Sequence, residues 1–255
     1  MKTRLFAFFI FYFLIFNLGS TLRAQTVVKD SSITVPMFQI SVGVHSPGGD
    51  LKSRFGNFAT LGGGFSIKTK KNYILGTEGY FQFGGDVKEL EVLDFLRNGN
   101  DQIINLGGRY ANVVYFQRGG NFTFTFGKVF PILGPNPNCG LRTTVGLGYW
   151  QHKIKIVDKE GGVFFLRDEY LAGFDRKTGG FVLNEFIGYH HQSNNRIINF
   201  TAGFEFSQGF TQNLRDYDFA TKQKDVQNRT DLSYGLRVSW FIPLYKKSPQ
   251  EFYFY

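Results

Sequence analysis

The chain has 255 residues, a formal net charge of +9 and one cysteine, Cys139. An internal disulfide is therefore excluded, and the scattered basic residues do not indicate nucleic-acid binding. Phenylalanine and tyrosine together supply 44 residues, and this aromatic load favours β-structure.

The first 24 residues have the layout of a secretory signal peptide. Lys2 and Arg4 precede an apolar run over residues 5–18, and small residues follow before the predicted cut at Gln25. An uncleaved membrane anchor is the alternative, but the run is shorter than the roughly 20 residues that a spanning helix needs. The sequence therefore predicts export from the cytoplasm.

Eight later segments alternate between apolar and polar residues with a period of two, which predicts strands. A further piece, 112–117, is expected to join the fourth strand across a break near Gly119 and Gly120. The faces of the sixth segment are ambiguous. The predicted strands are 37–45, 60–68, 73–83, 121–130, 141–153, 181–192, 197–208 and 232–242.

The connections between these strands are short and long in alternation. Alternation alone fits either a soluble sandwich or a transmembrane barrel, but the export signal, the strand lengths and this loop asymmetry favour the barrel. The prediction is an all-β, eight-stranded antiparallel transmembrane β-barrel in the cell outer membrane of a Gram-negative envelope, with short periplasmic turns and long extracellular loops. A short helix is expected within the insert 84–111, over residues 86–98.

The predicted organisation has four parts. Residues 1–24 form the signal peptide and 25–35 an N-terminal periplasmic segment. Residues 36–243 form the barrel, and 244–255 form a C-terminal tail.

Three pieces carry a resemblance: "AQ" at residues 24–25, "SPGGDLKSRFGNFATLGGGF" and the last strand, "YGLRVSW". Over residues 36–243 the chain resembles small outer-membrane β-barrel proteins of Bacteroidota. The resemblance implies an eight-stranded barrel and, through Gly235, Val238 and Trp240, a signal for the barrel assembly machinery. It implies no particular activity.

His191, Ser193 and Glu205 resemble in their spacing the catalytic set of the lipid A deacylase family. In that reading His191 is the base, Ser193 the nucleophile and Glu205 the residue that orients the imidazole. The predicted topology disfavours it, because the turn that contains Ser193 falls on the periplasmic side, away from the outer leaflet. Glu205 would also lie some 25 Å from that turn at about 3.3 Å per residue.

Four charged residues, Glu78, Arg142, Glu205 and Arg237, fall on predicted inward faces. Because buried charges must be paired, an interior ion-pair network is expected, with a proton or solute path as the alternative. The charges near Asp175 and Arg176 are expected to form a solvated loop surface.

The function predicted is a structural or interaction role, in which the outer loops contact a surface ligand or an envelope complex. A lipid A deacylase-like hydrolase is the alternative. Expected partners are outer-membrane lipid and lipopolysaccharide, the barrel assembly machinery and possible envelope proteins. No cofactor or metal is expected, since His152 has no second ligand at suitable spacing.

Overall fold

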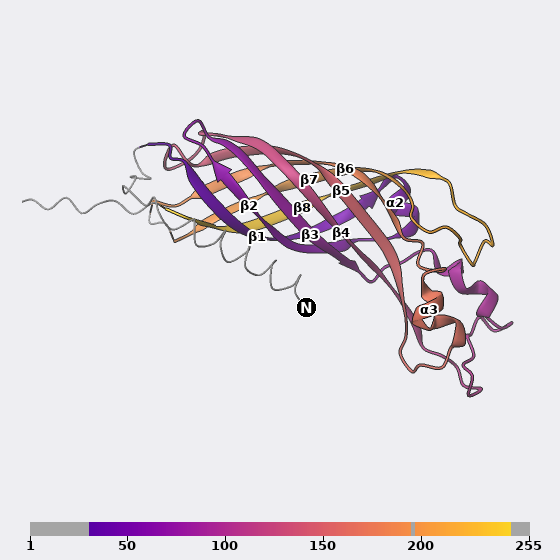
Figure 1. Cartoon of the computed structure of the whole chain (residues 1–255). Coiled ribbons are helices and arrows are strands. Elements are labelled where there is room, and N and C mark those ends of the chain that lie inside the picture. The colour runs from indigo at the N-terminus through magenta and orange to yellow at the C-terminus, as the bar shows by residue number, and fades with distance from the viewer. Residues whose placement is uncertain (1–30, 195–196, 246–255) are drawn as a thin grey trace, which may run out of the picture.

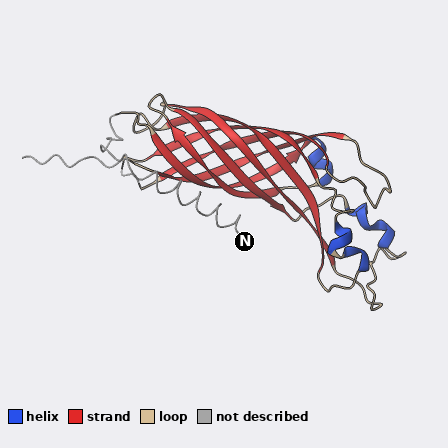
Figure 2. Ribbon diagram, in the orientation of Figure 1, coloured by secondary structure: helices blue, strands red, loops and turns tan. Residues whose placement is uncertain are grey.

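The computed structural model describes residues 31–194 and 197–245 (Figure 1). Its eight strands form one closed antiparallel barrel, in which each strand pairs with the next and β8 pairs back onto β1 (Figure 2). The prediction of an all-β, eight-stranded antiparallel barrel is confirmed. The predicted signal peptide lies outside the described residues. The strands are β1 (Val35–Gly48), β2 (Phe58–Lys68), β3 (Tyr73–Gly84), β4 (Val113–Phe130), β5 (Gly140–Asp158), β6 (Thr178–Gln192), β7 (Asn199–Asn213) and β8 (Asn228–Pro243).

The strand register fixes the tilt of the barrel wall. A line of paired residues that starts at Pro36 of β1 returns to β1 at Ser46, ten residues further along the strand. Such a stagger goes with strands tilted by about 35–45°. The line passes through Ile67, Leu75, Phe126, Val145, Glu185, Phe206 and Tyr234.

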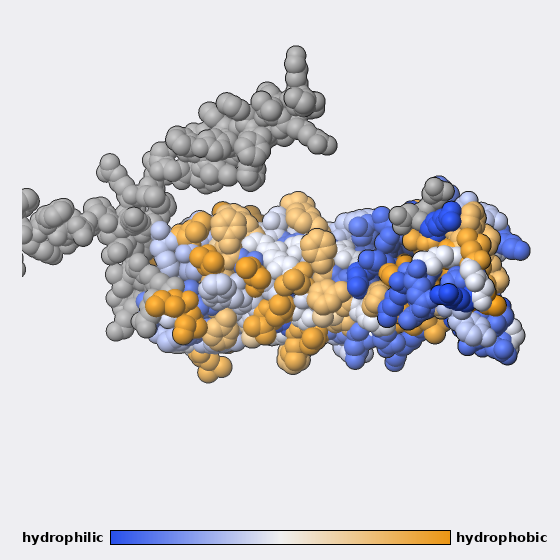
Figure 3. Space-filling model, turned by 90° about the horizontal axis from the view of Figure 1, so that it is seen from below, coloured by the Kyte–Doolittle hydropathy of each residue, from blue (hydrophilic) through white to orange (hydrophobic). Residues whose placement is uncertain are grey.

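The wall is apolar on its outside and polar on its inside. Phe38 and Val44 of β1 are 53% and 62% exposed, whereas Gln39 and Ser41 between them are 5% and 1% exposed. The same alternation recurs around the barrel, and hydrophobic residues cover the shaft in Figure 3 while hydrophilic ones gather toward the loop end. A soluble barrel has the opposite polarity, with its apolar side chains in the core.

β4 and β6 differ from what the sequence predicts or leaves open. β4 runs without interruption from Val113 to Phe130, so the expected break at Gly119 and Gly120 is wrong, because both glycines stay paired with β5. In β6 the inward set includes Val182, Asn184 and Phe186, which resolves the ambiguity of its faces.

The two ends of the barrel differ. One end carries short turns between β2 and β3 and between β6 and β7, and the other carries α2 (Gly49–Arg54), η1 (Leu90–Leu96), η2 (Phe164–Leu166) and α3 (Asp168–Leu171) in longer loops (Figure 1). Among the described residues, no helix is long and apolar enough to cross a membrane.

The prediction of a helix over residues 86–98 is mostly wrong. Only the 3₁₀ segment Leu90–Leu96 is helical, and Leu93 within it has non-helical backbone angles. Val87 instead forms a β-bridge with Phe55, so the chain cannot begin a helix there.

Candidate functional site

The four inward charges lie together in the middle of the barrel. Arg237 Nη1 is 2.8 Å from Glu78 Oε2 and 2.9 Å from Glu205 Oε1. Arg142 Nη2 is 3.2 Å from Glu78 Oε1. All four side chains are at most 6% exposed, so the cluster is a buried ion-pair network in which Glu78 and Arg237 are the central members.

Two closely packed glycines separate the arginines in the barrel wall. Arg142, Gly188, Gly203 and Arg237 are successive partners across β5, β6, β7 and β8. A Cβ at Gly203 would lie 2.2 Å from the Ile187 carbonyl oxygen and 2.4 Å from Gly188 Cα, so no larger residue fits without a shift of the backbone. A Cβ at Gly188 would lie 2.7 Å from Phe186 Cζ, so this glycine leaves room for the ring that the Arg237 guanidinium contacts.

Neutral side chains complete the network. Gln39 Nε2 donates to Glu78 at 2.7 Å, and the Tyr80 hydroxyl donates to Glu78 at 2.8 Å while it accepts from Arg237 at 2.8 Å. The Arg237 guanidinium lies 4.4 Å from the centre of the Phe186 ring, a cation–π distance. These contacts stabilise the buried charges, while Arg142 Nε and Arg237 Nε have no hydrogen-bond partner among the described residues.

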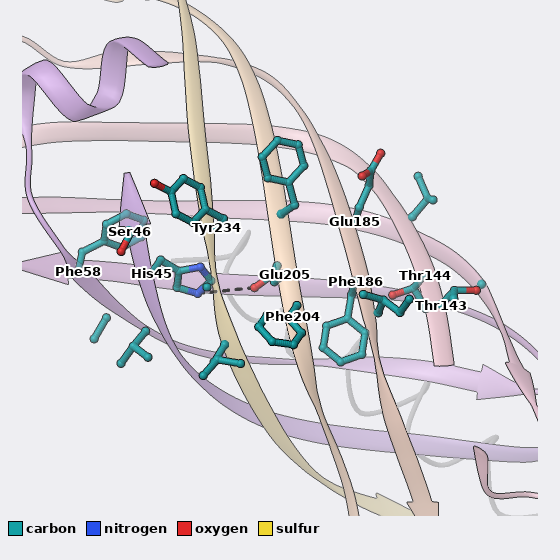
Figure 4. Close-up of a pocket in the computed structure, with 18 of the residues that line it drawn as sticks. His45, Ser46, Phe58, Thr143, Thr144, Glu185, Phe186, Phe204, Glu205 and Tyr234 are labelled. Carbon is teal, nitrogen blue, oxygen red and sulfur yellow. Dashed lines mark ion pairs between the residues drawn. The ribbon is translucent and has the colours of Figure 1, made fainter. Parts of the chain in front are cut away.

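A histidine extends the network toward the loop end. His45 Nε2 lies 3.7 Å from Glu205 Oε2 and 3.2 Å from Thr60 Oγ1. Figure 4 marks this contact between His45 and Glu205 with a dashed line, with Glu185 of the neighbouring strand directed away from it.

Near the loop end a second polar cluster is buried. His152 Nε2 lies 2.9 Å from Asp231 Oδ2, which also accepts from Thr211 Oγ1 at 2.5 Å. Phe55 and Trp150 contact the imidazole edge-on. Across the described residues, no group of three or more histidine, cysteine, aspartate or glutamate side chains could hold a metal ion, and here His152 has one carboxylate partner.

Apolar side chains from the loops fill the loop end of the barrel. Residues of the loops and their short helices and inward residues of β2, β5 and β6 form one buried cluster: Leu51, Phe55, Phe58, Val87, Val92, Leu93, Ile103, Trp150, Ile154, Ile156, Val163, Phe174 and Val182. Arg54, 2% exposed, ties this cap to two loops through Glu89 at 3.2 Å and Thr178 at 2.7 Å. The loops therefore form a packed cap.

The charges near Asp175 are not the solvated surface that was expected. Asp175 is 4% exposed and accepts from Arg215 and from Lys153 Nζ at 3.2 Å. Arg176 reaches Glu89 at 3.3 Å and Asp218 at 3.1 Å. These ion pairs hold the three long loops to one another.

The turn end is also filled. Lys68 is fully buried and its Nζ donates to Asn138 at 2.7 Å, to Asn72 at 3.0 Å and to the Ile33 carbonyl at 3.1 Å. The His190 ring stacks on Phe241 at 4.5 Å.

His191, Ser193 and Glu205 are not assembled into a triad. His191 lies opposite Phe200 on β7, five residues from Glu205, which corresponds to about 16 Å along a strand. Glu205 faces the interior, where it binds Arg237, whereas the His191 ring stacks on Phe200. Ser193 lies in the turn after β6, and its backbone N–H donates to Asn199.

The proposed assembly-signal residues lie on β8. Val238 and Trp240 are 50% and 53% exposed on the outer face. Gly235 faces inward, where a Cβ would lie 2.0 Å from the Val44 carbonyl oxygen. Their recognition during assembly stays a prediction.

Three residues that contribute to the buried contacts of the barrel were not predicted from the sequence. Arg54 lies in a segment with no strand alternation, Asp231 meets His152 across 79 residues, and Phe186 lies where the faces were ambiguous. The alternation of β8, extended backward by one step from Ser233, could have placed Asp231 inside.

No protein-family model and no curated protein sequence matches the chain. Among solved structures, it is similar to Ail of Yersinia pestis in complex with the heparin analogue sucrose octasulfate, with 10% identity, TM-score 0.38 and coverage of 82% of this chain and 99% of Ail. It is similar to Neisserial surface protein A, with 10% identity, TM-score 0.40 and coverage of 81% and 96%. A third is a major outer membrane protein of Thermus thermophilus, with 10% identity, TM-score 0.35 and coverage of 81% and 98%. Because these TM-scores are below 0.5, the architecture rests on the strand pairing within this chain.

Proposed function

We propose that this chain is an integral β-barrel of a bacterial outer membrane, with a sealed interior and a capped outer end that serves a structural or interaction role. The observation that carries the proposal is the inverted polarity of the wall. Phe81 and Phe124 on the outside are 75% and 65% exposed, whereas Glu78 and Arg237 inside are 3% and 2% exposed. Only hydrocarbon stabilises such an exterior, and closure satisfies every strand edge within it.

Membrane extraction tests this location. Urea-washed and carbonate-washed membranes should retain the protein, and boiling should change its mobility on a gel. A cysteine at Lys222, in the loop between β7 and β8, should be labelled on intact cells by an impermeant reagent, in a Cys139→Ser background. A soluble periplasmic pool would refute the location, and labelling only after lysis would reverse the orientation.

The interior supports a sealed barrel and not a porin. An eight-stranded barrel is just wide enough for side chains to fill it. Here the interior is occupied at three levels, by Lys68 at the turn end, by the ion pair of Glu78 and Arg237 at mid-height, and by Trp150 under the cap.

An interaction role is supported by apolar side chains on the outer surface of the loops. Leu106 and Tyr110, both between β3 and β4, are 71% and 60% exposed, and Val226 between β7 and β8 is 77% exposed. Exposed apolar surface beyond a membrane belt suits a protein partner. Photocrosslinking from Leu106 in intact cells should give a discrete adduct that Tyr110→Ser weakens, and no adduct at any loop position would contradict the role.

The hydrolase alternative is disfavoured by the separation of His191 and Glu205. Mass spectrometry of lipid A from a deletion strain should show no change in acylation. A changed acyl pattern, restored by the wild-type gene but not by Ser193→Ala, would make the protein an enzyme.

A further inference from the structure

A hollow opens beside the extension of β5 that rises beyond the apolar belt. It has a volume of about 730 Å³ and lies between residues 153–158 of β5 and the loop to β6. Lys153, Lys155, Arg167 and Arg215 line it, together with Asp158 and Asp175. This volume suits the headgroup of a lipid or a small ligand.

Among the side chains that line the hollow, four are basic and two are acidic. Asp175 binds both Lys153 and Arg215, and Asp158 accepts backbone N–H groups from Glu160 and Val163. Neither Lys155 nor Arg167 has an ion pair with any side chain that the structure describes, although the Arg167 guanidinium lies 5.0 Å from the Phe164 ring.

A neighbouring arginine adds to this charge. Arg118 of β4 is the direct cross-strand partner of Lys153, and its guanidinium donates only to the Gln117 carbonyl among the described residues. Like charges directly opposite one another destabilise a sheet unless a counter-charge lies between them. Asp175 supplies such a counter-charge to Lys153, but Arg118 has no ion pair among the described side chains, so its charge favours a bound anion nearby.

The position of the hollow relative to the apolar belt favours a lipid headgroup as the bound anion. Lys153 and Lys155 project from the same face of β5 as Val145, Leu147 and Tyr149, the apolar side chains of the belt. In the proposed orientation they lie on the outer-leaflet side of the belt, four and six residues beyond Tyr149 along β5. Basic side chains at that level attract anionic lipid headgroups.

We infer that this hollow binds the phosphorylated headgroup of a glycolipid in the outer leaflet, with Lys155 and Arg167 as the main phosphate contacts and Lys153 and Arg215 held in place by Asp175. This inference rests on the proposed outer-membrane location. The acyl chains of such a lipid would lie along the apolar face of β5 below the hollow.

The test uses the mature protein refolded in zwitterionic detergent, with diphosphoryl lipid A and its dephosphorylated form as probes. Diphosphoryl lipid A should raise the unfolding temperature, and the dephosphorylated form should not. The double variant Lys155→Gln/Arg167→Gln should bind diphosphoryl lipid A roughly tenfold or more weakly, since each basic residue near an anionic surface contributes about 1 kcal/mol. The matched control, Lys52→Gln/Lys222→Gln, removes the same charge from exposed sites away from the hollow and should bind as wild type.

Three outcomes would overturn the inference. They are equal binding of the two lipid A forms, equal loss in the control variant, and displacement of diphosphoryl lipid A by inorganic phosphate at the same concentration, which would assign a free anion as the ligand. The membrane-retention test does not involve these residues, so failure of lipid binding leaves the proposed location intact.

Discussion

Glu185 and Glu205 lie on neighbouring strands, one register step apart, and point to opposite sides of the barrel wall. Glu185 is paired with Phe206, and Glu205 with Phe186. Glu205 is 6% exposed and binds Arg237 inside, whereas Glu185 is exposed among the apolar side chains outside. The wall is a single β-sheet, so side chains of neighbouring residues point to different faces. Two glutamates at almost the same height therefore lie one outside the barrel and one inside it.

Replacing Glu185 by leucine should stabilise the protein in lipid. The paired line that rises from Pro36 to Ser46 passes through Glu185 near its middle, so the carboxylate lies near mid-height of the belt. Charged groups on a lipid face cost up to about 2–4 kcal/mol at the midplane, and carboxylates cost less. Glu185→Leu should therefore add roughly 1–2 kcal/mol to the free energy of unfolding in lipid vesicles. Glu185→Gln should give a smaller gain, and a loss of stability in both variants would mean that this face does not contact lipid.

Replacing either interior glutamate should instead destabilise the protein, and the two losses should differ in size. Glu78 contacts both arginines, whereas loss of Glu205 leaves Arg237 its contact with Glu78. Glu78→Gln should cost about 3–5 kcal/mol, because it leaves the buried Arg142 without a carboxylate and takes one of two carboxylates from Arg237. Glu205→Gln should cost less, about 1–3 kcal/mol. Urea titration of the refolded variants measures both, and a larger loss for Glu205→Gln would contradict the assigned centre of the network.

Gly203 should not tolerate a side chain. Gly203→Ala would bring a Cβ to 2.4 Å from Gly188 Cα, so the wall between the two arginines must shift. We expect a loss of about 1–3 kcal/mol, in the range of overpacked cores. Gly79→Ala is the matched control, since its nearest contacts are at 3.6 Å and its Cβ would face outward. Equal stabilities of the two variants would show that the glycine pair is not required for arginine placement.

The alternation of side chains predicts most of the barrel but not its interior contacts. Seven strands had one clearly apolar face, and period two is enough to orient such a strand. β6 was ambiguous because Val182 and Phe186 face inward while Glu185 faces outward. Contacts such as His152 with Asp231 depend on the ten-residue stagger of the closed ring, which no local pattern encodes.

A loop carboxylate should titrate below its usual range. Burial alone would raise the pKa of Asp225, but the hydrogen bond and charge of Arg229 and the Gln227 backbone N–H lower it below the usual 3.8. The stabilisation is therefore present above pH 3.8 and is lost as the pH falls through the lowered pKa. An NMR titration of the Asp225 carboxyl should give a pKa below 3.8 that Arg229→Gln moves upward. An unchanged pKa in that variant would remove Arg229 as the cause.

Planar-bilayer recording on the refolded wild-type protein tests the sealed barrel most directly. Arg237, Trp150 and Lys68 are each at most 2% exposed within the interior, so we expect no stable channels under conditions in which a refolded porin conducts. Stable channels of porin-like conductance would show that the interior is open and would contradict a sealed barrel.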